Sequence, residues 1–335
     1  MSDVISFPGL GLEFPVDRVA FSIGSIDIYW YAILLATGFL MAVLFFEKNA
    51  RRFGLNDDKA LDVIFCAAIA GIAGARLYFV IFKWKELFAD NPLEIFNLRG
   101  GGLGFYGAVI GGVLGVLLGC KIFKVPFLPF LDLAGGALFI GQGIGRWGNF
   151  VNGECFGCNT ELPWGMTSQN IIRYIMTHTA EEMGCEMTPY LPVHPTFLYE
   201  SLWCAAGLIL FCLLMKKRRF DGAMFLFYAG WNGMGRAWIE GLRTDSLMLG
   251  SFRVSQLLGA LMAVAAFGIL LYINNKIKNL PPEERKPLWC ETEEGKAMAG
   301  IINEEAPLSQ ETEETEEPEA EEETKEEEED LGNDH

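Results

Sequence analysis

Long apolar runs alternate with short polar connections along most of this chain. Seven runs stand out, each close to the roughly 20 residues with which a helix crosses a bilayer. Their boundaries are Ile26–Phe46, Ala60–Phe82, Gly102–Phe123, Pro126–Gly145, Thr196–Met215, Gly222–Ile239 and Phe252–Ile273. Because a backbone inside a bilayer must satisfy its own hydrogen bonds, each run is predicted to be a helix. The pattern predicts an all-α integral membrane protein with about seven transmembrane helices, and it excludes an ordinary soluble enzyme.

The Lys and Arg residues of the short connections predict how these helices are oriented. Basic residues follow the first, third, fifth and seventh runs: Lys48, Arg51, Arg52, Lys59, Lys121, Lys124, Lys216, Lys217, Arg218, Arg219, Lys276 and Lys278. If the helices alternate in direction, these four places share one side of the membrane, which is predicted to be cytoplasmic. The N-terminus is then outside and the C-terminus cytoplasmic. The loop at 147–195 lies outside and is predicted to form a small extracytoplasmic cap.

Acidic residues are concentrated at the C-terminus. The formal charge of the chain is −17, and residues 283–335 hold 22 acidic and 4 basic groups, or −18, which leaves +1 for residues 1–282. A segment so charged and so poor in apolar residues does not fold alone. We therefore predict a polytopic membrane domain at 1–282, with the catalytic groups, and a disordered acidic cytoplasmic tail at 283–335. The near-neutral membrane domain gives no support to nucleic-acid binding.

A few ionisable residues interrupt the apolar runs, where they are costly and usually mark a function. They are Arg76, Asp132, Arg146, Glu200, Arg236 and Glu240, with Arg243 just beyond. In the predicted orientation the arginines lie toward the outer ends of their helices, where converging guanidinium groups would suit a phosphate or carboxylate. Two alternatives stay open. The arginines extend to the membrane interface, or Arg236 forms an ion pair with Glu240 on its own helix face.

The third run carries a face made of glycine. Gly107, Gly111, Gly115 and Gly119 recur every four residues. Small residues at this spacing let two transmembrane helices approach closely. The face is therefore predicted to serve packing.

The residues around Arg146 form a distinctive motif, Gly145-Arg-Trp-Gly-Asn-Phe-Val-Asn-Gly-Glu-Cys-Phe-Gly157. It resembles the signature of the prolipoprotein diacylglyceryl transferase family, Gly-Arg-x-Gly-Asn-Phe-x-Asn-x-Glu-x-x-Gly, at all eight fixed positions. Further stretches between about Phe21 and Ile273 are similar to that family: Ile28-Tyr-Trp-Tyr-Ala32, Gly74-Ala-Arg76, His194-Pro-Thr-Phe-Leu-Tyr-Glu200 and Gly235-Arg-Ala-Trp-Ile-Glu-Gly-Leu-Arg243. Only the acidic tail falls outside the resemblance.

The resemblance implies a multi-pass transferase of the bacterial cell membrane, with its active site toward the extracytoplasmic side. Such an enzyme moves the sn-1,2-diacylglyceryl group of phosphatidylglycerol to the lipobox cysteine thiol of a prolipoprotein signal peptide. It leaves a thioether, releases glycerol phosphate and begins lipoprotein maturation. The implied partners are phosphatidylglycerol, prolipoproteins and the bilayer, and no cofactor or metal is implied. A permease for an anionic solute, which would use the same arginines without chemistry, is the alternative from another class.

The resemblance also implies roles for individual residues. Arg146 and Arg236 are expected to hold the phosphate, with Arg243 as a third contact or a partner of Glu240. The other expected contacts of phosphatidylglycerol are Asn149, Asn152, Gly157 and Tyr31. Candidate bases for the thiol are Glu154, Glu240 and His194. An ion pair between Glu154 and an arginine is an open alternative for that carboxylate.

One position departs from the family pattern. Many members carry a histidine in the motif Gly-Gly-x-x-x-His-Gly, where Gly101-Gly-Leu-Gly-Phe-Tyr-Gly107 places Tyr106. A tyrosine, with an ordinary pKa of about 10, is a poor base at neutral pH but a good hydrogen-bond donor. Tyr106 is expected at the catalytic site, where either another group takes the proton or base catalysis matters less than positioning.

Three cysteines lie in the predicted outer loop. Cys155 and Cys158 form a Cys-x-x-Cys motif, and Cys185 follows in the same loop as His178 and His194. A disulfide is one interpretation, and a zinc site is a weaker one because the pair lies inside the lipid-site motif. The stretch at 170–178 is amphipathic, and it lies either in the membrane interface or on the protein as a surface helix.

Overall fold

The computed structural model describes residues 3–89, 91–97, 101–244, 248–249 and 252–302. The long helices are α1 (Trp30–Ala50), α2 (Asp57–Lys83), α3 (Phe105–Ile122), α4 (Phe127–Asn152), α7 (Thr196–Leu214), α8 (Ala223–Ile239) and α9 (Val254–Asn279). Shorter helices are α5 (Gln169–Thr177), α6 (Ala180–Met183) and α10 (Glu293–Met298), with single turns η1 (Pro8–Leu10), η2 (Arg51–Phe53), η3 (Trp84–Phe88), η4 (Pro92–Phe96), η5 (Met215–Lys217), η6 (Glu240–Leu242), η7 (Pro282–Glu284) and η8 (Trp289–Glu291). The strands are β1 (Asp3–Phe7), β2 (Leu12–Val16), β3 (Val19–Ile23), β4 (Ile26–Tyr29), β5 (Met248–Leu249) and β6 (Phe252–Arg253).

Six helical segments of the described ranges are long and apolar enough to cross a membrane. They are Trp30–Phe53, Asp57–Phe88, Phe105–Ile122, Phe127–Asn152, Thr196–Lys217 and Val254–Asn279. The remaining predicted run, Gly222–Ile239, is helical as α8, but at 17 residues this helix is shorter than the other six. The structure thus supports a mostly helical membrane protein, while the number of spans and their orientation stay predictions.

The N-terminal segment adds β-strands to the mostly helical membrane protein. Residues before α1 form two antiparallel hairpins, β1–β2 and β3–β4. The first helix begins at Trp30, so Ile26–Tyr29, taken as its first turn, is a strand paired with β3. Apolar residues alternate with polar ones at Ile26, Asp27 and Ile28, which favours a strand, but the continuous run that follows obscured this short pattern.

Helix α4 continues past the predicted end at Gly145 and stops at Asn152. Gly153 terminates it with a left-handed φ of 64°, a conformation that glycine adopts without strain. Asn149 and Asn152, which the predicted outer loop at 147–195 included, therefore lie on the same helix as Arg146. This places them with helical spacing on one side of α4.

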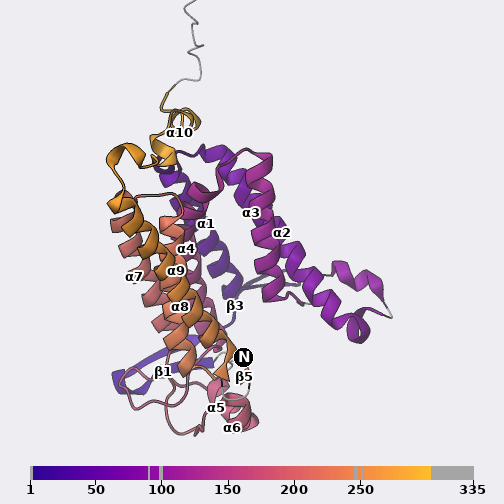
Figure 1. The fold of residues 1–335 in the computed structure, drawn as a ribbon. Coiled ribbons are helices and arrows are strands. Elements are labelled where there is room, and N and C mark those ends of the chain that lie inside the picture. The colour runs from indigo at the N-terminus through magenta and orange to yellow at the C-terminus, as the bar shows by residue number, and fades with distance from the viewer. Residues whose placement is uncertain (1–2, 90, 98–100, 245–247, 250–251, 303–335) are drawn as a thin grey trace, which may run out of the picture. The chain divides into compact units, whose positions relative to one another are not determined.

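Helices α1, α4, α7, α8 and α9 form one bundle, and α2 and α3 pack chiefly against each other beside α1 (Figure 1). Large apolar side chains fill the bundle, including the buried Phe130, Phe139 and Phe211. The glycine face of α3 is buried against α2, and a side chain at Gly115 would collide with the Ala67 backbone. The predicted packing role of that face is confirmed.

A second apolar cluster lies at the other end of the bundle. The buried residues Ile5 and Phe7 of β1 pack with Phe156, Ile171 and Val193. Asp3 joins these parts because its carboxylate accepts hydrogen bonds from the first backbone N–H groups of α5. We call β1, β2 and residues 153–195 the hairpin lobe. The amphipathic stretch at 170–178 is thus α5, whose apolar face packs on the protein.

The C-terminal region corrects the predicted boundary of the tail. Residues 282–302 contain η7, η8 and α10 and contact the connections between helices. The Trp289 indole donates to the Gly54 carbonyl at 2.8 Å, and its backbone N–H donates to Asp221 at 2.8 Å. Trp289 and the small residues around it supply the apolar surface that the average over 283–335 concealed. The rest of the predicted tail, 303–335, lies outside the described residues.

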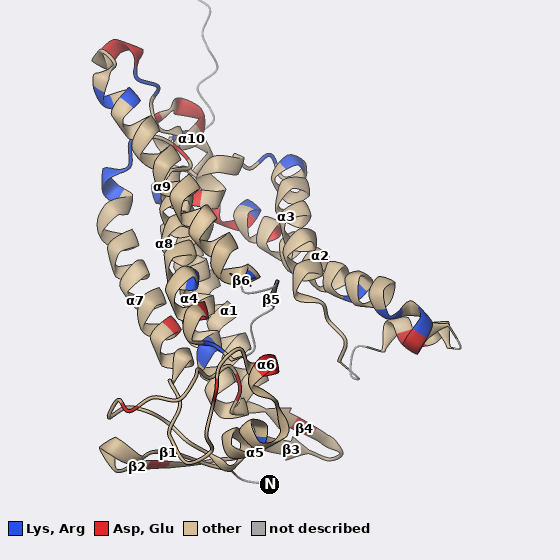
Figure 2. Ribbon diagram, turned by 60° about the horizontal axis from the view of Figure 1, so that its bottom comes forward, with Lys and Arg blue, Asp and Glu red and all other residues tan. Residues whose placement is uncertain are grey.

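The basic connections gather at the end of the bundle that carries α10 (Figure 2). Arg218, between α7 and α8, donates to the Arg52 carbonyl at 3.0 Å and lies over the Phe53 ring. The connections after the first and fifth predicted runs are therefore neighbours, as the alternating topology requires. The hairpin lobe and the end of the Arg146 motif lie at the opposite end.

Candidate functional site

A shared carboxylate joins two of the candidate arginines. Glu200, in the first turns of α7, accepts from Arg146 Nε at 2.6 Å and pairs with Arg243 NH1 at 3.1 Å. Arg146 comes from α4, and Arg243 follows η6. Arg243 and Glu200 are each 8% exposed, whereas 21% of the Arg146 side chain is exposed. Two guanidinium groups from distant parts of the chain are thus held about one buried carboxylate, which we call the arginine cluster.

The third arginine of the site pairs within its own helix. Arg236 NH1 lies 2.9 Å from Glu240 Oε2, and the Glu240 side chain is only 6% exposed. The backbone carbonyl of Glu240 also accepts from Arg253 at 2.6 Å, which ties the end of α8 to the start of α9. The predicted alternative of an Arg236–Glu240 ion pair is confirmed. Arg243 pairs with Glu200, a partner that the sequence analysis did not assign to it.

Hydrogen bonds lead from Arg146 along the rest of its motif. Arg146 NH1 lies 3.4 Å from Asn149 Oδ1, and Asn149 donates to Glu154 Oε1 at 3.0 Å. Asn152 donates to the same oxygen at 3.1 Å. Amides, and not an arginine, therefore hold Glu154 in the described part of the chain, so the alternative of an ion pair there is wrong. The Glu154 side chain keeps its other oxygen available for a further donor.

Gly157 lies where three segments cross. Its backbone N–H donates to the His194 carbonyl, and the next N–H, of Cys158, donates to the Leu242 carbonyl at 2.8 Å. A Cβ at Gly157 would lie 2.8 Å from both the Leu242 oxygen and the His194 Cβ. Only glycine allows this approach, which places the motif directly beside Arg243.

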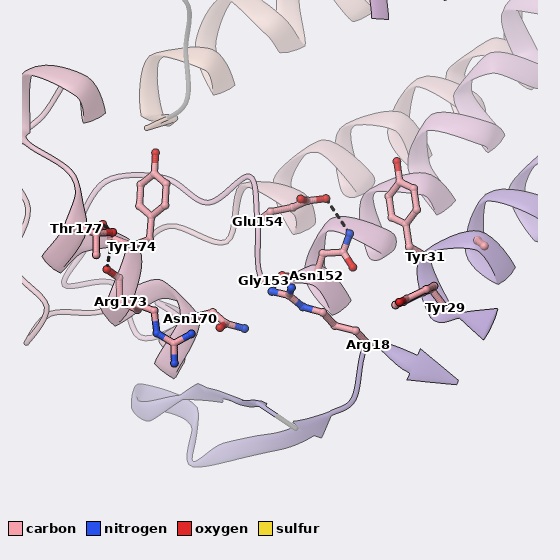
Figure 3. A pocket seen from close by; sticks show the side chains of 11 residues that line it. Arg18, Tyr29, Tyr31, Asn152, Gly153, Glu154, Asn170, Arg173, Tyr174 and Thr177 are labelled. Carbon is pink, nitrogen blue, oxygen red and sulfur yellow. Dashed lines mark hydrogen bonds between the residues drawn. The ribbon is translucent and has the colours of Figure 1, made fainter. Parts of the chain in front are cut away.

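A pocket of about 640 Å³ opens at the end of the motif. Tyr31, Asn152 and Glu154 line it together with Arg18 and Arg173, neither of which the sequence analysis singled out (Figure 3). Tyr31 packs on the motif itself, because a side chain at Gly148 would collide with its ring. The predicted lipid-site residues Tyr31, Asn149 and Asn152 are thus close to one another and to Glu154.

Arg76 does not join the arginine cluster. Its guanidinium donates to five backbone carbonyls, those of Glu94, Ile95, Asn97, Gly101 and Gly102. It also lies against the Phe79 and Phe88 rings. The expectation that four guanidinium groups converge is therefore wrong for Arg76, whose role is to hold the α2–α3 connection.

Tyr106 lies in the first turn of α3, half exposed, with its ring 6.3 Å from that of Tyr78. Its described contacts are with α2 and α3 and not with the arginine cluster. The structure therefore does not bring Tyr106 together with the other expected catalytic residues.

Comparison with known proteins gives the site its context. The family model described as prolipoprotein diacylglyceryl transferase matches residues 18–272. The chain belongs to this family. It is 39% identical over 269 residues to the phosphatidylglycerol–prolipoprotein diacylglyceryl transferase of Clostridioides difficile, covering 80% of this chain and 100% of that protein. It is 40% identical over 259 residues to the protein of the same name from Enterococcus faecalis, covering 76% and 90%.

Membership in the diacylglyceryl transferase family makes the chain a transferase, and the six long apolar helices make it a multi-pass membrane protein of a bacterial type. The matched residues include the whole of the arginine cluster and its motif. They end before η7, so the C-terminal segment at 282–302 lies outside the family match.

His194 lies at the boundary between the hairpin lobe and α7. Burial lowers the pKa of its imidazole below the ordinary 6.5, which disfavours the charged form of the ring. Its Nδ1 lies 3.1 Å from the Tyr199 hydroxyl, which itself accepts from Trp164. The hydrogen bonds of His194 and Tyr199 orient the segment around His194, which crosses Gly157.

The cysteines of the hairpin lobe have separate states. Cys158 and Cys185 form a disulfide, one of the interpretations left open by their sequence. Cys155 is not part of this disulfide, and its backbone has a positive φ of 58°. Within the described ranges, no group of three His, Cys, Asp or Glu residues is arranged to hold a metal ion.

Sequence reasoning undervalued two polar features of this transferase. Glu200 was noted as an intramembrane charge but was not assigned to the site that it bridges. Gln142, Tyr228 and Asn232 form a hydrogen-bonded set between α4 and α8, with Gln142 Nε2 donating to Tyr228 at 2.7 Å. This set could have been found in the sequence, because its members are uncharged polar residues within apolar runs. Asp132, also an intramembrane charge, caps α8 by accepting from the Gly222 and Phe225 N–H groups.

Proposed function

We propose that this chain transfers the diacylglyceryl group of phosphatidylglycerol to the lipobox cysteine thiol of prolipoproteins. The names of its relatives in Clostridioides difficile and Enterococcus faecalis contain both substrates, and the family match covers the proposed site. The reaction forms a thioether and releases glycerol phosphate. It is the first step of lipoprotein maturation in the bacterial cell membrane.

The main support for this proposal is that Arg146 has guanidinium donors with no hydrogen-bond partner among the described residues. Arg146 contacts Glu200 through Nε and Asn149 through NH1, and its NH2 has no hydrogen-bond partner among the described residues. Arg236 likewise contacts Glu240 through one guanidinium nitrogen. A guanidinium offers five N–H donors in a planar fork that matches phosphate. Arg146 and Arg236 are oriented by carboxylates and keep donors for the phosphate of the lipid, and Arg243 holds Glu200 in place.

The chemistry needs a nucleophile and a stabilised leaving group. The thiol of the acceptor loses its proton, and the thiolate sulfur attacks the glyceryl carbon that bears the phosphate. The carbon–sulfur bond forms while the carbon–oxygen bond breaks, and the electron pair leaves on the phosphate oxygen of glycerol phosphate. Arg146 and Arg236 stabilise this developing charge in a water-poor site, where fixed donors act most strongly.

Glu154 is the proposed acceptor of the thiol proton. Glu200 and Glu240 are each paired with arginine, whereas Glu154 accepts from two neutral amides and lines the pocket. Asn149 and Asn152 hold the carboxylate and contact hydroxyl groups of the headgroup. The nearby guanidinium groups favour the thiolate. Glu240 then orients Arg236. Tyr106, on α3, contacts substrate only if α2 and α3 move toward the bundle.

The proposed orientation places this site toward the extracytoplasmic side. The basic connections lie at the end of the bundle opposite the hairpin lobe, and the positive-inside rule assigns that end to the cytoplasm. The hairpin lobe then forms the cap over the site, and both lipid and signal peptide reach it from the bilayer. The membrane domain carries the catalytic groups, and the C-terminus is then cytoplasmic.

The test uses membranes containing the full chain, phosphatidylglycerol and a synthetic lipobox peptide. We expect the wild type to release glycerol phosphate and to add a diacylglyceryl mass to the peptide thiol. Arg146→Ala is expected to lower this rate by roughly 10²–10³-fold, the usual effect of removing a donor to developing charge. Arg146→Lys retains the charge but lacks the planar guanidinium, so its transfer rate should lie between those of the wild type and Arg146→Ala.

Full activity in Arg146→Ala would remove the phosphate role of Arg146. Solute uptake by the wild type with no modified peptide would identify an anion permease instead. Arg219→Ala is the matched control, because this exposed arginine lies at the basic end of the bundle, away from the arginine cluster.

A further inference from the structure

The pocket at the end of the motif contains two arginines that the proposed reaction does not use. Arg18 precedes β3, and Arg173 lies on α5 of the hairpin lobe. In Figure 3 their guanidinium groups lie on either side of Asn170. Neither belongs to an intramembrane run, so the two cations come to one cavity only through the fold.

The two arginines are bound differently. Arg18 NH2 donates to the Asn152 carbonyl at 2.7 Å, which anchors it to the last residue of α4. The Arg173 side chain has no hydrogen-bond or ion-pair partner among the described residues, and it is exposed. Arg173 therefore has all its donors available to a ligand in the pocket, while Arg18 has its remaining ones.

The other lining groups define what such a ligand must be. The pocket holds the hydroxyls of Tyr29 and Tyr31 and the amide of Asn170, and Glu154 is its one carboxylate. With Arg18 and Arg173, the charged lining groups sum to +1. At about 640 Å³ the cavity accommodates a small organic phosphate with several hydroxyl groups. A phosphate monoester carries about −1.5 to −2 charges at pH 7. It would pair with both arginines while its hydroxyls meet tyrosine and asparagine.

The pocket is connected to the arginine cluster by the polar residues of one helix. Arg146, Asn149 and Asn152 follow one another along the last turns of α4, and Glu154 links the two amides. The amides of Asn149 and Asn152 therefore lie between Arg146 and Arg18 and offer polar contacts to a departing phosphate. The middle of the bundle, by contrast, is filled with apolar side chains.

We propose that Arg18 and Arg173 form a second phosphoglycerol subsite, which receives glycerol phosphate after the carbon–oxygen bond breaks. This inference rests on the proposed function and extends it to the product. Release of the diacylglyceryl group converts a phosphodiester with one charge into a monoester with nearly two. The more anionic group binds better to a site with two available arginines and open access to water. The subsite thereby separates product from the reacting carbon.

Equilibrium binding of sn-glycerol 1-phosphate to the full chain in detergent tests the subsite. We expect Arg173→Ala to weaken binding about three- to tenfold, since exposed charge pairs are partly screened. Arg173→Lys should be weakened less. Arg18→Ala should behave like Arg173→Ala, and Arg219→Ala, at the basic end, should bind like the wild type. Because the Arg173 side chain is exposed and has no hydrogen-bond or ion-pair partner among the described residues, its loss should not change the thermal midpoint.

A second arm separates the free product from the lipid headgroup, which share the phosphoglycerol chemistry. Binding to nanodiscs of phosphatidylglycerol, against phosphatidylcholine, should depend on Arg146 and not on Arg173. Binding of glycerol phosphate should show the reverse dependence. Equal weakening of both ligands by Arg173→Ala would assign the pocket to the lipid headgroup and overturn the product subsite. Unchanged glycerol phosphate binding in both Arg18→Ala and Arg173→Ala would overturn it as well.

These outcomes are distinct from failure of the proposed function. A wild-type chain that forms no thioether would refute the transferase reaction, whatever glycerol phosphate binding shows. A wild-type chain that forms the thioether, with arginine variants that bind glycerol phosphate normally, would refute the subsite alone.

Discussion

Arg76 and Arg146 are both arginines in apolar helices, but their surroundings differ. Arg76 on α2 uses all three guanidinium nitrogens on five backbone carbonyls of one connection. Arg146 on α4 is oriented by the Glu200 carboxylate and the Asn149 amide, and keeps donors free of described partners. Both lie in stretches that resemble the same family, so the sequence alone did not separate them.

The difference shows how an intramembrane charge takes on either a structural or a chemical role. Carbonyl oxygens that surround a guanidinium satisfy every donor and leave no place for a ligand. A shared carboxylate holds the guanidinium in position through one edge and leaves the other edge open. We therefore expect substitutions at Arg76 to affect stability first, and substitutions around Arg146 to affect transfer first.

Glu200→Gln should have the largest effect and tests the shared carboxylate directly. The change leaves Arg146 and Arg243 facing each other without a counter-charge, and breaking a buried ion pair costs about 3–5 kcal/mol. We expect a large fall in the thermal midpoint in detergent and at least about a hundredfold loss of transfer. Glu86→Gln is the matched control, because its pair with Lys83 is exposed and should contribute little. Normal transfer in Glu200→Gln would break the comparison between the two arginines.

Arg76→Met should separate stability from chemistry. The substitution leaves the five backbone carbonyls that accept from Arg76 without their donor, and each buried unsatisfied group costs about 1–3 kcal/mol. We expect a lower thermal midpoint but a transfer rate within about tenfold of the wild type, in contrast to Arg146→Ala. Thermal unfolding and peptide modification, measured on the same preparations, check this. A stable Arg76→Met protein with no transfer would place Arg76 with the chemical arginines.

Gly157→Ala tests how the motif is placed beside Arg243. The new Cβ would collide with the Leu242 oxygen and the His194 Cβ, at a cost of about 1–3 kcal/mol as for overpacked cores. We expect a moderate loss of stability and a reduced transfer rate, because Arg243 moves relative to Glu200. Gly141→Ala is the control, since an added Cβ there meets no atom within 4 Å. Equal effects of both substitutions would show that the close approach at Gly157 does not decide the result.

The smallest expected effect is the pH dependence due to His194. Burial lowers its pKa below 6.5 in the folded chain, so the unfolded chain binds a proton more readily. The stabilisation is complete above about pH 6.5 and is lost as the pH falls through the lower, folded-state pKa. We expect the thermal midpoint to fall in that window, and to fall less in His194→Gln. An identical pH profile in the variant would assign the acid sensitivity to other groups.

The apolar runs and the motif were strong predictors because each depends on local information. A run of apolar residues forms a helix in a bilayer whatever its neighbours are, and the described part of the chain contains six such helices. The thirteen-residue motif identified Arg146, Asn149, Asn152, Glu154 and Gly157, and the family match includes all of them. The hairpin of β3 and β4 was missed because its short alternating pattern runs directly into the apolar run of α1.

Predictions about partners were weaker. Arg243 was expected at Glu240 or a phosphate, and it pairs with Glu200, which lies more than forty residues earlier in the chain. Arg76 was grouped with the other arginines by its depth alone. Arg18 and Arg173 were not selected, since exposed arginines are common and nothing in their local sequence places them in one pocket. The segment at 282–302 was hidden by the average charge of the whole tail.

The sequence by itself determined the helical membrane architecture, the family and most of the residues around Arg146. These follow from hydrophobicity and from a contiguous motif, which act over a few helical turns. Only the tertiary structure decided which arginine shares Glu200, which is saturated by carbonyls, and which pair faces the pocket beside Tyr31. Such choices depend on distances between helices that are far apart in the chain. The free energy of a buried charge is set by those distances, and residue type alone does not specify them.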